Sequence, residues 1–452
     1  MSTVTNRPQL VEEPSYSLSM DTSMTSTNTK TKQAITFQAI IVLGAGMLFY
    51  LYEYILRVSP SVMTDGLMRD FGVTSTMLGV LTSFYYYSYV ALQIPCGMIV
   101  DHLGARRVIT SSALICSIGA YLFAKSDTLA GAELGRFLIG AGSACAYISC
   151  MKIGAVWFAA EKFAIISGIG QMMGVFGGTF GGKPFAILVN AYGWRGAMVI
   201  ASVAGLAVTA IAWTFVRDYP KGYVCPHTKE GEDKENLIDG LKAITSNPQS
   251  WLIGLYGCMM YLPLSAFAEL WAVPYLMQRY GVNNEQAAGV SVLLFVGIAF
   301  GAPVGAWLSE RIKSRKKVMS ISAVGTFFMF LLIIYLPNTT FTQMSVMQFI
   351  AGVLCGGQIL YFAAAKEINL PQFSATTIGF TNCLVMVSGV IFQPALGLVL
   401  DLAWDGQLKA DGTRLYSLQA YQTSLTLVAF CLLVAWGLLQ KIKETHPGSF
   451  KK

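Results

Sequence analysis

Four polar side chains lie on one face of a single apolar run, residues 35–58. They are Tyr50, Glu53, Tyr54 and Arg57. The last three follow Tyr50 by three, four and seven positions, and this spacing places all four on the same side of a helix. The guanidinium of Arg57 can bind a carboxylate or phosphate through two hydrogen bonds, and Glu53 can bind an amine or a proton. We expect this face to line a cavity or to pack on another helix. The alternative is a structural Glu–Arg pair near the end of the run, where a buried charge costs less.

A second acidic group stands in the apolar run 250–276, which carries Tyr261 and Glu269. Glu269 lies about as deep in its run as Glu53 does in the first run. Two glutamates placed in this way could form a gate that senses protons or cations. The alternative for Glu269 is a carboxylate at the lipid–water interface, beside aromatic residues.

A second arginine, Arg136, lies inside the apolar run 129–151. A charged side chain in such a run needs a partner, which we expect to be Glu133 or a carboxylate of the first run. We predict a conformational or coupling role for Arg136, with a purely structural buried pair as the alternative.

Uncharged polar side chains form a third group. Each can contact a solute, although a hydrogen bond between two helices is the commoner role for such residues: Tyr85, Tyr89, Gln171, Gln358 and Asn382. The nine cysteines lie mostly in apolar runs without a CxxC pair, and there are only three histidines. We therefore expect the cysteines to act as small apolar residues. We predict no metal site, no cofactor and no catalytic residue, so the protein should not be an enzyme.

The composition assigns these runs to a membrane. Hydrophobic residues make up 54% of the 452 and charged residues only 12%, against about 25% charged in a typical soluble domain. Twelve apolar runs are long enough to cross a bilayer: 35–58, 76–99, 107–125, 129–151, 163–190, 195–216, 250–276, 286–308, 318–337, 343–365, 374–400 and 417–440. We attribute the net charge of +7 to membrane topology and predict no nucleic-acid partner.

The runs divide into six and six around one long polar stretch. This layout predicts an all-α membrane protein with two pseudo-symmetric six-helix bundles, residues 34–217 and 250–440. Residues 218–249 should form a cytoplasmic central loop. The Ser/Thr-rich residues 1–33 should form a disordered cytoplasmic tail, and residues 441–452 a second tail.

Lysine and arginine set the expected orientation. Most of the 31 fall in the segments on the same side of the membrane as the N-terminus. Such residues are enriched in cytoplasmic loops, so we expect both termini in the cytoplasm.

A compact motif, GMIVDHLGARR at residues 97–107, separates the second and third runs. It resembles the signature G-x-x-x-D-x-x-G-x-R-[RK] of the major facilitator superfamily, which lies between helices 2 and 3. The resemblance implies a latch that closes the cytoplasmic side in the outward-facing state and breaks when that side opens. Its residues would be Gly97, Asp101, Gly104, Arg106 and Arg107.

Other stretches are similar to the same superfamily. Residues 305–317 are a worn copy of the motif between the eighth and ninth runs, and residues 136–144 resemble its motif R-x-x-x-G-x-G-x-A. Residues 52–63 resemble the phagosomal-transporter-type carriers of intracellular bacteria. More distantly, the chain is similar to the lysosomal dipeptide carriers of the superfamily. It departs from them at residues 143–145, which are Ser, Ala and Cys where that branch has a glutamate.

The resemblance implies a secondary active transporter in a bacterial inner membrane that works by alternating access. We predict proton-coupled uptake of a small polar organic solute, such as an amino acid or a similar nutrient, by a monomer. The same scaffold could instead carry a siderophore or a drug-like compound, inward or outward. A third possibility, from another class, is a membrane nutrient sensor that binds solute without transporting it.

Overall fold

The computed structural model of the protein describes three ranges of residues: 36–159, 162–220 and 237–447. The predicted tail 1–33 therefore lies outside the described residues. Within these ranges nearly all regular structure is helical, and the one β feature is an isolated antiparallel bridge between Leu408 and Arg414. The predicted all-α class is confirmed.

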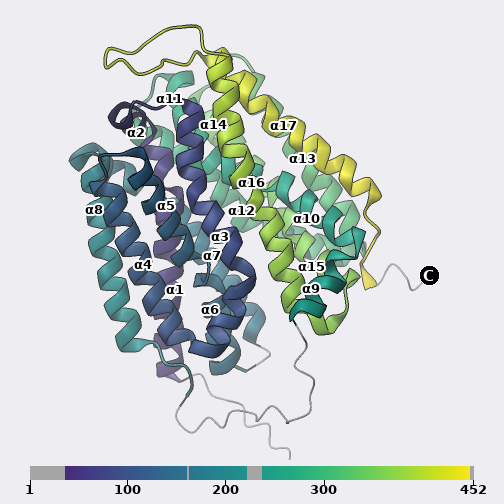
Figure 1. Ribbon diagram of the computed structural model, residues 1–452. Coiled ribbons are helices and arrows are strands. Elements are labelled where there is room, and N and C mark those ends of the chain that lie inside the picture. Colours follow the sequence, from purple (N-terminus) through teal and green to yellow (C-terminus); the bar gives the residue numbers. More distant parts are fainter. Residues whose placement is uncertain (1–35, 160–161, 221–236, 448–452) are drawn as a thin grey trace, which may run out of the picture. The chain divides into compact units, whose positions relative to one another are not determined.

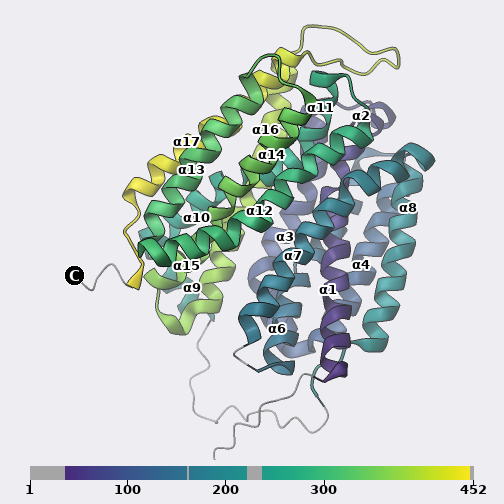
Figure 2. The same cartoon turned by 180° about the vertical axis from the view of Figure 1, so that it is seen from behind.

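The helices follow the two halves of the chain. The first half forms α1 (Phe37–Val58), η1 (Ser59–Val62), α2 (Thr64–Phe71), α3 (Ser75–Leu103), α4 (Ala105–Lys125), α5 (Leu129–Ser143), α6 (Ala146–Trp157), α7 (Phe163–Gly181) and α8 (Lys183–Phe215). The second half forms α9 (Leu237–Thr245), α10 (Pro248–Met260), η3 (Pro263–Trp271), α11 (Ala272–Tyr280), α12 (Asn284–Ile312), α13 (Arg315–Tyr335), α14 (Phe341–Cys355), η4 (Gly356–Ile359), α15 (Leu360–Ile368), η5 (Pro371–Phe373), α16 (Ser374–Leu402) and α17 (Leu418–Lys441). Figures 1 and 2 show the first-half helices, purple to teal, on one side and the second-half helices, green to yellow, on the other.

Twelve membrane crossings account for this arrangement. Among the described residues, ten helical segments are long and apolar enough to span a bilayer. One of them, Ile165–Phe215, has 51 residues and contains two crossings, because Gly193 breaks the helix with a φ of 69°. The remaining crossing is α3, which has 29 residues but a more polar composition. The predicted twelve helices in two bundles are therefore confirmed.

The fourth crossing of each bundle packs closely on the second crossing. A Cβ atom at Gly140 of α5 would overlap the backbone carbonyl of Tyr85 in α3. In the second bundle, a Cβ atom at Gly352 of α14 would overlap the carbonyl of Leu294 in α12. Small residues thus bring the two backbones into contact at matching places, which supports the predicted internal repeat.

The two bundles are tied together at one end of the helices, which we call the Asp401 end. The carboxylate of Asp401, at the end of α16, accepts hydrogen bonds from the backbone N–H of Thr76 at 2.8 Å and of Ser75 at 3.3 Å. These residues begin α3 in the other bundle, so an anion sits at a helix N-terminus, where the helix dipole stabilises it. Arg414, 3.0 Å away, completes the site as an ion pair.

Two further polar contacts join the bundles at the Asp401 end. Lys409, in the loop between α16 and α17, pairs with Asp65 at 2.9 Å, and Asn284 donates to the carbonyl of Val62 at 2.8 Å. The loop between α16 and α17 stands at the top of Figure 1. The opposite end, where α3 finishes, we call the Asp101 end.

At the Asp101 end, each bundle carries the same helix cap. Asp218, which follows the sixth crossing, accepts a 2.9 Å hydrogen bond from the backbone N–H of Arg106 at the start of α4. Glu444, which follows the twelfth crossing, accepts a 2.9 Å hydrogen bond from the backbone N–H of Arg315 at the start of α13. The repetition is independent support for two related bundles.

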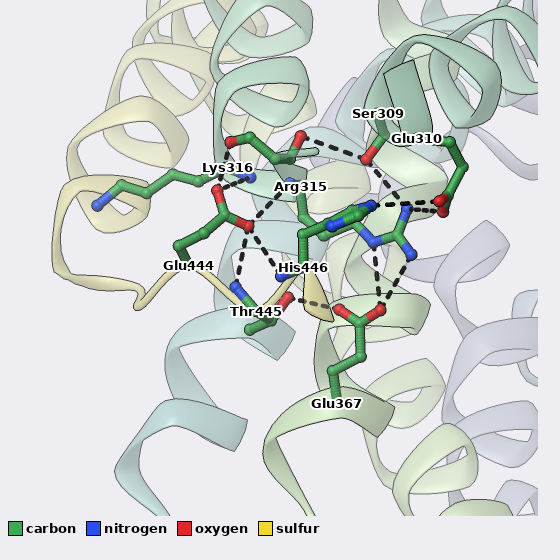
Figure 3. Close-up of polar contacts among 9 residues, drawn as sticks. Ser309, Glu310, Arg315, Lys316, Glu367, Glu444, Thr445 and His446 are labelled. Carbon is green, nitrogen blue, oxygen red and sulfur yellow. Dashed lines mark hydrogen bonds and ion pairs between the residues drawn. The ribbon is translucent and has the colours of Figure 1, made fainter. Parts of the chain in front are cut away.

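Figure 3 shows how the segment after α17 docks on the second bundle. Thr445 donates a hydrogen bond of 2.6 Å to Glu367 at the end of α15, and Glu367 also pairs with Arg315 at 3.0 Å. Burial raises the pKa of the Glu444 carboxyl, but hydrogen bonds from Ser314 and from backbone amides outweigh it, so the pKa lies below its ordinary value. The charged Glu444 therefore stabilises this corner of the fold.

Two details differ from the sequence-based expectation. The stretch 218–249, predicted to be a loop, contains the helix α9 in its described part. The cysteines do not all act as separate small apolar residues, because Cys96 of α3 and Cys145 at the junction of α5 and α6 form a disulfide. Sequence spacing could not show this pairing, since the two residues lie 49 positions apart on different helices.

Candidate functional site

The predicted pair Glu53 and Arg57 is buried between helices. Glu53 is 0% exposed and Arg57 4%, and an Arg57 Nη atom lies 3.4 Å from the Glu53 carboxylate. The hydroxyl of Tyr85, from α3, accepts a 2.8 Å hydrogen bond from Arg57 Nε and donates one of 3.0 Å to Glu53. A buried ion pair is weak evidence for stability, because removing two charges from water costs several kcal/mol per ion. The burial and geometry of the pair are therefore shown, and its functional role stays a prediction.

Aromatic rings surround the guanidinium of Arg57. Its central carbon lies 4.5 Å from the ring centroid of Tyr54 and 5.0 Å from that of Tyr89. The ring faces carry partial negative charge, so they hold a cation without neutralising it. Arg57 thus keeps its charge and stays within reach of an anion that could replace Glu53.

The prediction that Arg136 pairs with a carboxylate is wrong. Arg136 is 1% exposed and donates to two backbone carbonyls, that of Leu56 at 2.9 Å and that of Thr82 at 3.5 Å. The Leu56 carbonyl lacks its usual backbone donor because that donor would be the N–H of Pro60, and proline has none; the Ser59 hydroxyl also donates to it at 3.0 Å. Arg136 therefore fastens α5 to the irregular end of α1.

Glu269 faces the Arg57 region from the other bundle. It is 1% exposed on η3, a π-helical segment in which each turn holds an extra residue, a form that often marks functional sites. The hydroxyl of Tyr86, from α3, donates a hydrogen bond to one carboxylate oxygen of Glu269. The other oxygen has no hydrogen-bond partner among the described residues.

Two other predicted residues link the bundles at the same place. Tyr261, at the end of α10, interacts with Tyr54 of α1 through their side chains. Asn382 of α16 interacts in the same way with Tyr89 of α3. The residues gathered here, which we call the central cluster, come from α1, α3, α5, the end of α10, η3 and α16: Glu53, Tyr54, Arg57, Tyr85, Tyr86, Tyr89, Arg136, Tyr261, Glu269 and Asn382.

Three predicted residues lie at the edge of the central cluster or beyond it. The ring centroid of Tyr50 lies 5.4 Å from that of Tyr147 on α6, and the Tyr147 hydroxyl accepts a 3.3 Å hydrogen bond from Gln171. Gln358 is buried on η4, where its amide nitrogen lies 3.2 Å from the sulfur of Cys355. Tyr50 and Gln171 therefore border the cluster, and Gln358 makes its described contact elsewhere.

The central cluster is shut off from a cleft at the Asp401 end. This cleft of about 550 Å³ is lined by residues that include Arg69, Asp70 and Arg195, and by none of the cluster. The structure therefore offers no route to Arg57 through this cleft.

Among the described residues, the hydrogen bonds and ion pairs of the motif at residues 97–107 with other elements go to α6 and to residues in or just after α8. Asp101 pairs with Lys152 of α6 at 2.8 Å, and neither Arg106 nor Arg107 is its described partner. Arg106 instead donates to the carbonyl of Trp213 at 2.8 Å, and Arg107 is exposed. Whether these residues form a latch in another state stays a prediction.

The two motif glycines behave differently. Gly104 has a φ of 80°, and a Cβ atom there would overlap the carboxylate of Asp218, so glycine is required on both counts. At Gly97 a Cβ atom would meet nothing within 4 Å, so no neighbouring helix comes close to Gly97 in this structure.

Sequence reasoning missed Tyr86 and Asp401. The prediction includes Tyr85 and Tyr89 but not Tyr86, the tyrosine that reaches the other bundle, because the run Tyr85-Tyr86-Tyr87 does not indicate which hydroxyl does so. Asp401 ends a long apolar run, and a lone acid at such a position carries no signal of a partner more than 300 residues away.

Comparison with known proteins identifies the family to which the chain belongs. A family model described as Major Facilitator Superfamily matches residues 38–392 and 270–449. The chain belongs to the major facilitator superfamily. It is accordingly a multi-pass membrane protein of a transporter family and not an enzyme. The predicted superfamily membership is confirmed, whereas the narrower resemblance to phagosomal-transporter-type carriers stays a prediction.

Individual relatives within the superfamily are distant. A probable sulfoacetate transporter, SauU, of Cupriavidus necator is 23% identical over 382 residues, which cover 80% of this chain and 87% of SauU. The membrane sensor protein UhpC of Salmonella typhimurium is 21% identical over 387 residues, with coverages of 81% and 85%.

The fold is also found among solved structures. The inward-facing, unoccupied structure of a bacterial homologue of the human lysosomal transporter Spinster superposes with a TM-score of 0.78. It shares 18% sequence identity, and the match covers 90% of this chain and 98% of that one. At this identity the likeness supports the fold alone.

Proposed function

We propose that this superfamily member takes up a small polar organic solute that carries an anionic group, such as a carboxylate. The buried Arg57 carries the proposal, since its guanidinium is held by Glu53 and Tyr85 beside the plane where the two bundles meet. An incoming anion can replace Glu53 as the partner of Arg57. An amino acid satisfies this requirement, and so does a dicarboxylate or a sulfonate.

The charge balance of the central cluster supports an anionic solute. It contains two arginines, Arg57 and Arg136, and two glutamates, Glu53 and Glu269. If either glutamate takes up a proton, the cluster gains one positive charge, which an anionic solute neutralises. This coupling of proton and solute supports proton-driven uptake. The name of the relative SauU, a probable sulfoacetate transporter, agrees with an organic anion as cargo.

We infer that the two bundles rock around the central cluster. Polar contacts join them at the Asp401 end, and others lie deeper, in and around the central cluster, so we infer that the Asp401 end is closed. The distribution of lysine and arginine supports an orientation in which the Asp101 end and both termini lie in the cytoplasm of a bacterial cell. The protein would act as a monomer in the inner membrane.

A thermal-shift screen of the purified protein tests the proposed cargo. A solute that binds the folded protein raises its melting temperature by mass action. We expect stabilisation by members of a panel of amino acids, dicarboxylates and short sulfonates, and none in the variant Arg57→Ala. Stabilisation only by bulky cations or ferric siderophores would contradict the proposal and favour a carrier of siderophores or drug-like compounds.

A sensor is the second candidate function, because the relative UhpC is described as a membrane sensor protein. A sensor binds the solute without moving it. Uptake of the stabilising solute into proteoliposomes therefore separates the two functions: accumulation supports a transporter, and saturable binding without accumulation supports a sensor.

A further inference from the structure

The contact between Tyr86 and Glu269 joins the two bundles at the centre of the molecule. Tyr86 belongs to α3 of the first bundle and is fully buried, and Glu269 belongs to η3 of the second bundle and is 1% exposed. One oxygen of Glu269 accepts a hydrogen bond from Tyr86, and the other has no partner among the described residues. No cation of the described chain lies within 4.0 Å of this carboxyl group.

The two glutamates of the central cluster differ in whether a cation accompanies the carboxyl group. Glu53 has Arg57 as an ion-pair partner and Tyr85 as a hydrogen-bond donor. Glu269 has only Tyr86, whose hydroxyl is uncharged. A buried carboxylate that lacks a cation costs several kcal/mol, whereas a buried protonated carboxyl group costs far less.

The remaining groups around Glu269 do not supply the missing cation. Arg57 is paired with Glu53, and Arg136 donates to the carbonyls of Leu56 and Thr82. The charged and titratable groups that act on Glu269 across the cluster are Arg57, Arg136, Glu53, Tyr54, Tyr86 and Tyr261. Of the elements packed against η3, α16 contributes neutral groups: Gln393 donates to the carbonyl of Ser265, and Ser388 shares a hydrogen bond with the Ser265 hydroxyl.

We propose that protonation of Glu269 stabilises the closed Asp401 end, with Tyr86 as the residue that positions the carboxyl group. The inference rests on the proposed function and assigns its proton to one carboxyl group. When the Asp401 end opens, water reaches Glu269 and the carboxylate takes one proton from it. Closure buries the neutral carboxyl group against Tyr86.

Release completes the cycle. The same proton leaves Glu269 to water that enters from the Asp101 end, and the Glu269 carboxylate is left buried with no cation. That state favours reopening of the Asp401 end, where water can solvate the charge. One proton is taken up and one is given off in each cycle. Because the protonated carboxyl group favours closure, the closed form binds up to one proton more than the open form at equilibrium.

The coupling of closure to proton binding predicts how strongly the ratio of closed to open molecules depends on pH. If closure binds one proton, the ratio of closed to open molecules changes by up to about tenfold for each pH unit. The ratio can be followed by electron–electron distance measurements between spin labels at Ala130 and Thr342. These residues are exposed, and they occupy equivalent positions at the starts of α5 and α14, one in each bundle at the Asp401 end. Cys225, outside the described residues, is replaced by Ser in every variant.

We expect the distance at the Asp401 end to lengthen in the wild-type protein between about pH 5 and about pH 9. Glu269→Gln resembles the protonated acid, so it should stay closed across this range. Tyr86→Phe should weaken closure and keep a pH response with a different midpoint. Ser83→Ala is the matched control, since it removes a 2.9 Å hydrogen bond between the bundles, to the carbonyl of Gly389, without touching a titratable group.

The outcomes separate the two proposals. A wild-type distance that ignores pH, or a pH response that survives in Glu269→Gln, overturns the assignment of the proton. Loss of the pH response in Ser83→Ala also overturns it, because any broken contact between the bundles would then suffice. The distances need no solute, so this test can fail while solute uptake succeeds, and uptake can fail while the pH response is found.

Discussion

The substitution Asp401→Asn should open the end at which the bundles are tied together. Asp401 accepts hydrogen bonds from the backbone N–H of Ser75 and Thr76 and from the hydroxyls of Thr76 and Tyr416, and it pairs with Arg414. Asparagine keeps one acceptor oxygen, so donors at the other oxygen lose their partner. It also loses the charge at the N-terminus of α3.

The effect can be estimated from these contacts. A charge at a helix N-terminus contributes roughly 0.3–1 kcal/mol, and hydrogen bonds to a charged group contribute roughly 1.5–3 kcal/mol each before the asparagine recovers part of them. We expect Asp401→Asn to destabilise the closed state relative to the open state by about 2 kcal/mol, which lowers the closed-to-open ratio about 30-fold.

Spin labels at Ala130 and Thr342 report this ratio, and Asp411→Asn provides a matched control. Asp411 lies in the same loop and bonds only to the neighbouring Thr413 among its described hydrogen bonds, at 2.6 and 3.1 Å. Asp401→Asn should therefore populate a longer distance that Asp411→Asn does not. Identical distance distributions in the two variants would refute the view that Asp401 holds this end closed.

Three further predictions concern binding and stability. Arg57→Lys should weaken binding of the anionic solute about tenfold or more, because an ammonium cannot reproduce the fork that contacts both Tyr85 and an anion; unchanged affinity by titration calorimetry would make Arg57 structural. Gly104→Ala should lower the melting temperature, with a cost of roughly 1–3 kcal/mol for a strained backbone, whereas an unchanged melting temperature would contradict the contact with Asp218. Glu444 has a lowered pKa in the folded protein, so its contribution to stability is present above its unfolded pKa and is lost as the pH falls through its folded pKa. The melting temperatures of the wild type and Glu444→Gln should thus differ at pH 7, and the difference should begin to shrink near the unfolded pKa of about 4.3 and vanish below the folded pKa; a constant difference would refute this account.

Much of the fold could be predicted because hydropathy and chain order determine it. The bilayer requires long apolar helices whose backbone groups are satisfied internally, so the twelve runs became twelve crossings. The pair Glu53 and Arg57 could be predicted for a similar reason, since a spacing of four residues places both side chains on one helical face.

The partners of buried polar residues were harder to predict, because local departures from the α-helix decide them. Pro60 frees the carbonyl that Arg136 binds, which a search for carboxylates does not consider. Tyr261 and Glu269, eight residues apart, would share one face of a continuous α-helix, but η3 is π-helical, and its wider turns shift the direction of each later side chain. The contact of Tyr86 with Glu269 depends on this shift and on how two distant bundles meet.

Uptake into proteoliposomes tests the central claim most directly. The protein is reconstituted with an inward proton gradient and a radiolabelled panel of amino acids, dicarboxylates and short sulfonates, and is compared with Arg57→Ala. We predict that at least one anionic solute accumulates against its gradient, that a protonophore abolishes the accumulation, and that Arg57→Ala does not accumulate the solute. Accumulation that is equal in Arg57→Ala, or transport confined to solutes without an anionic group, would contradict the account.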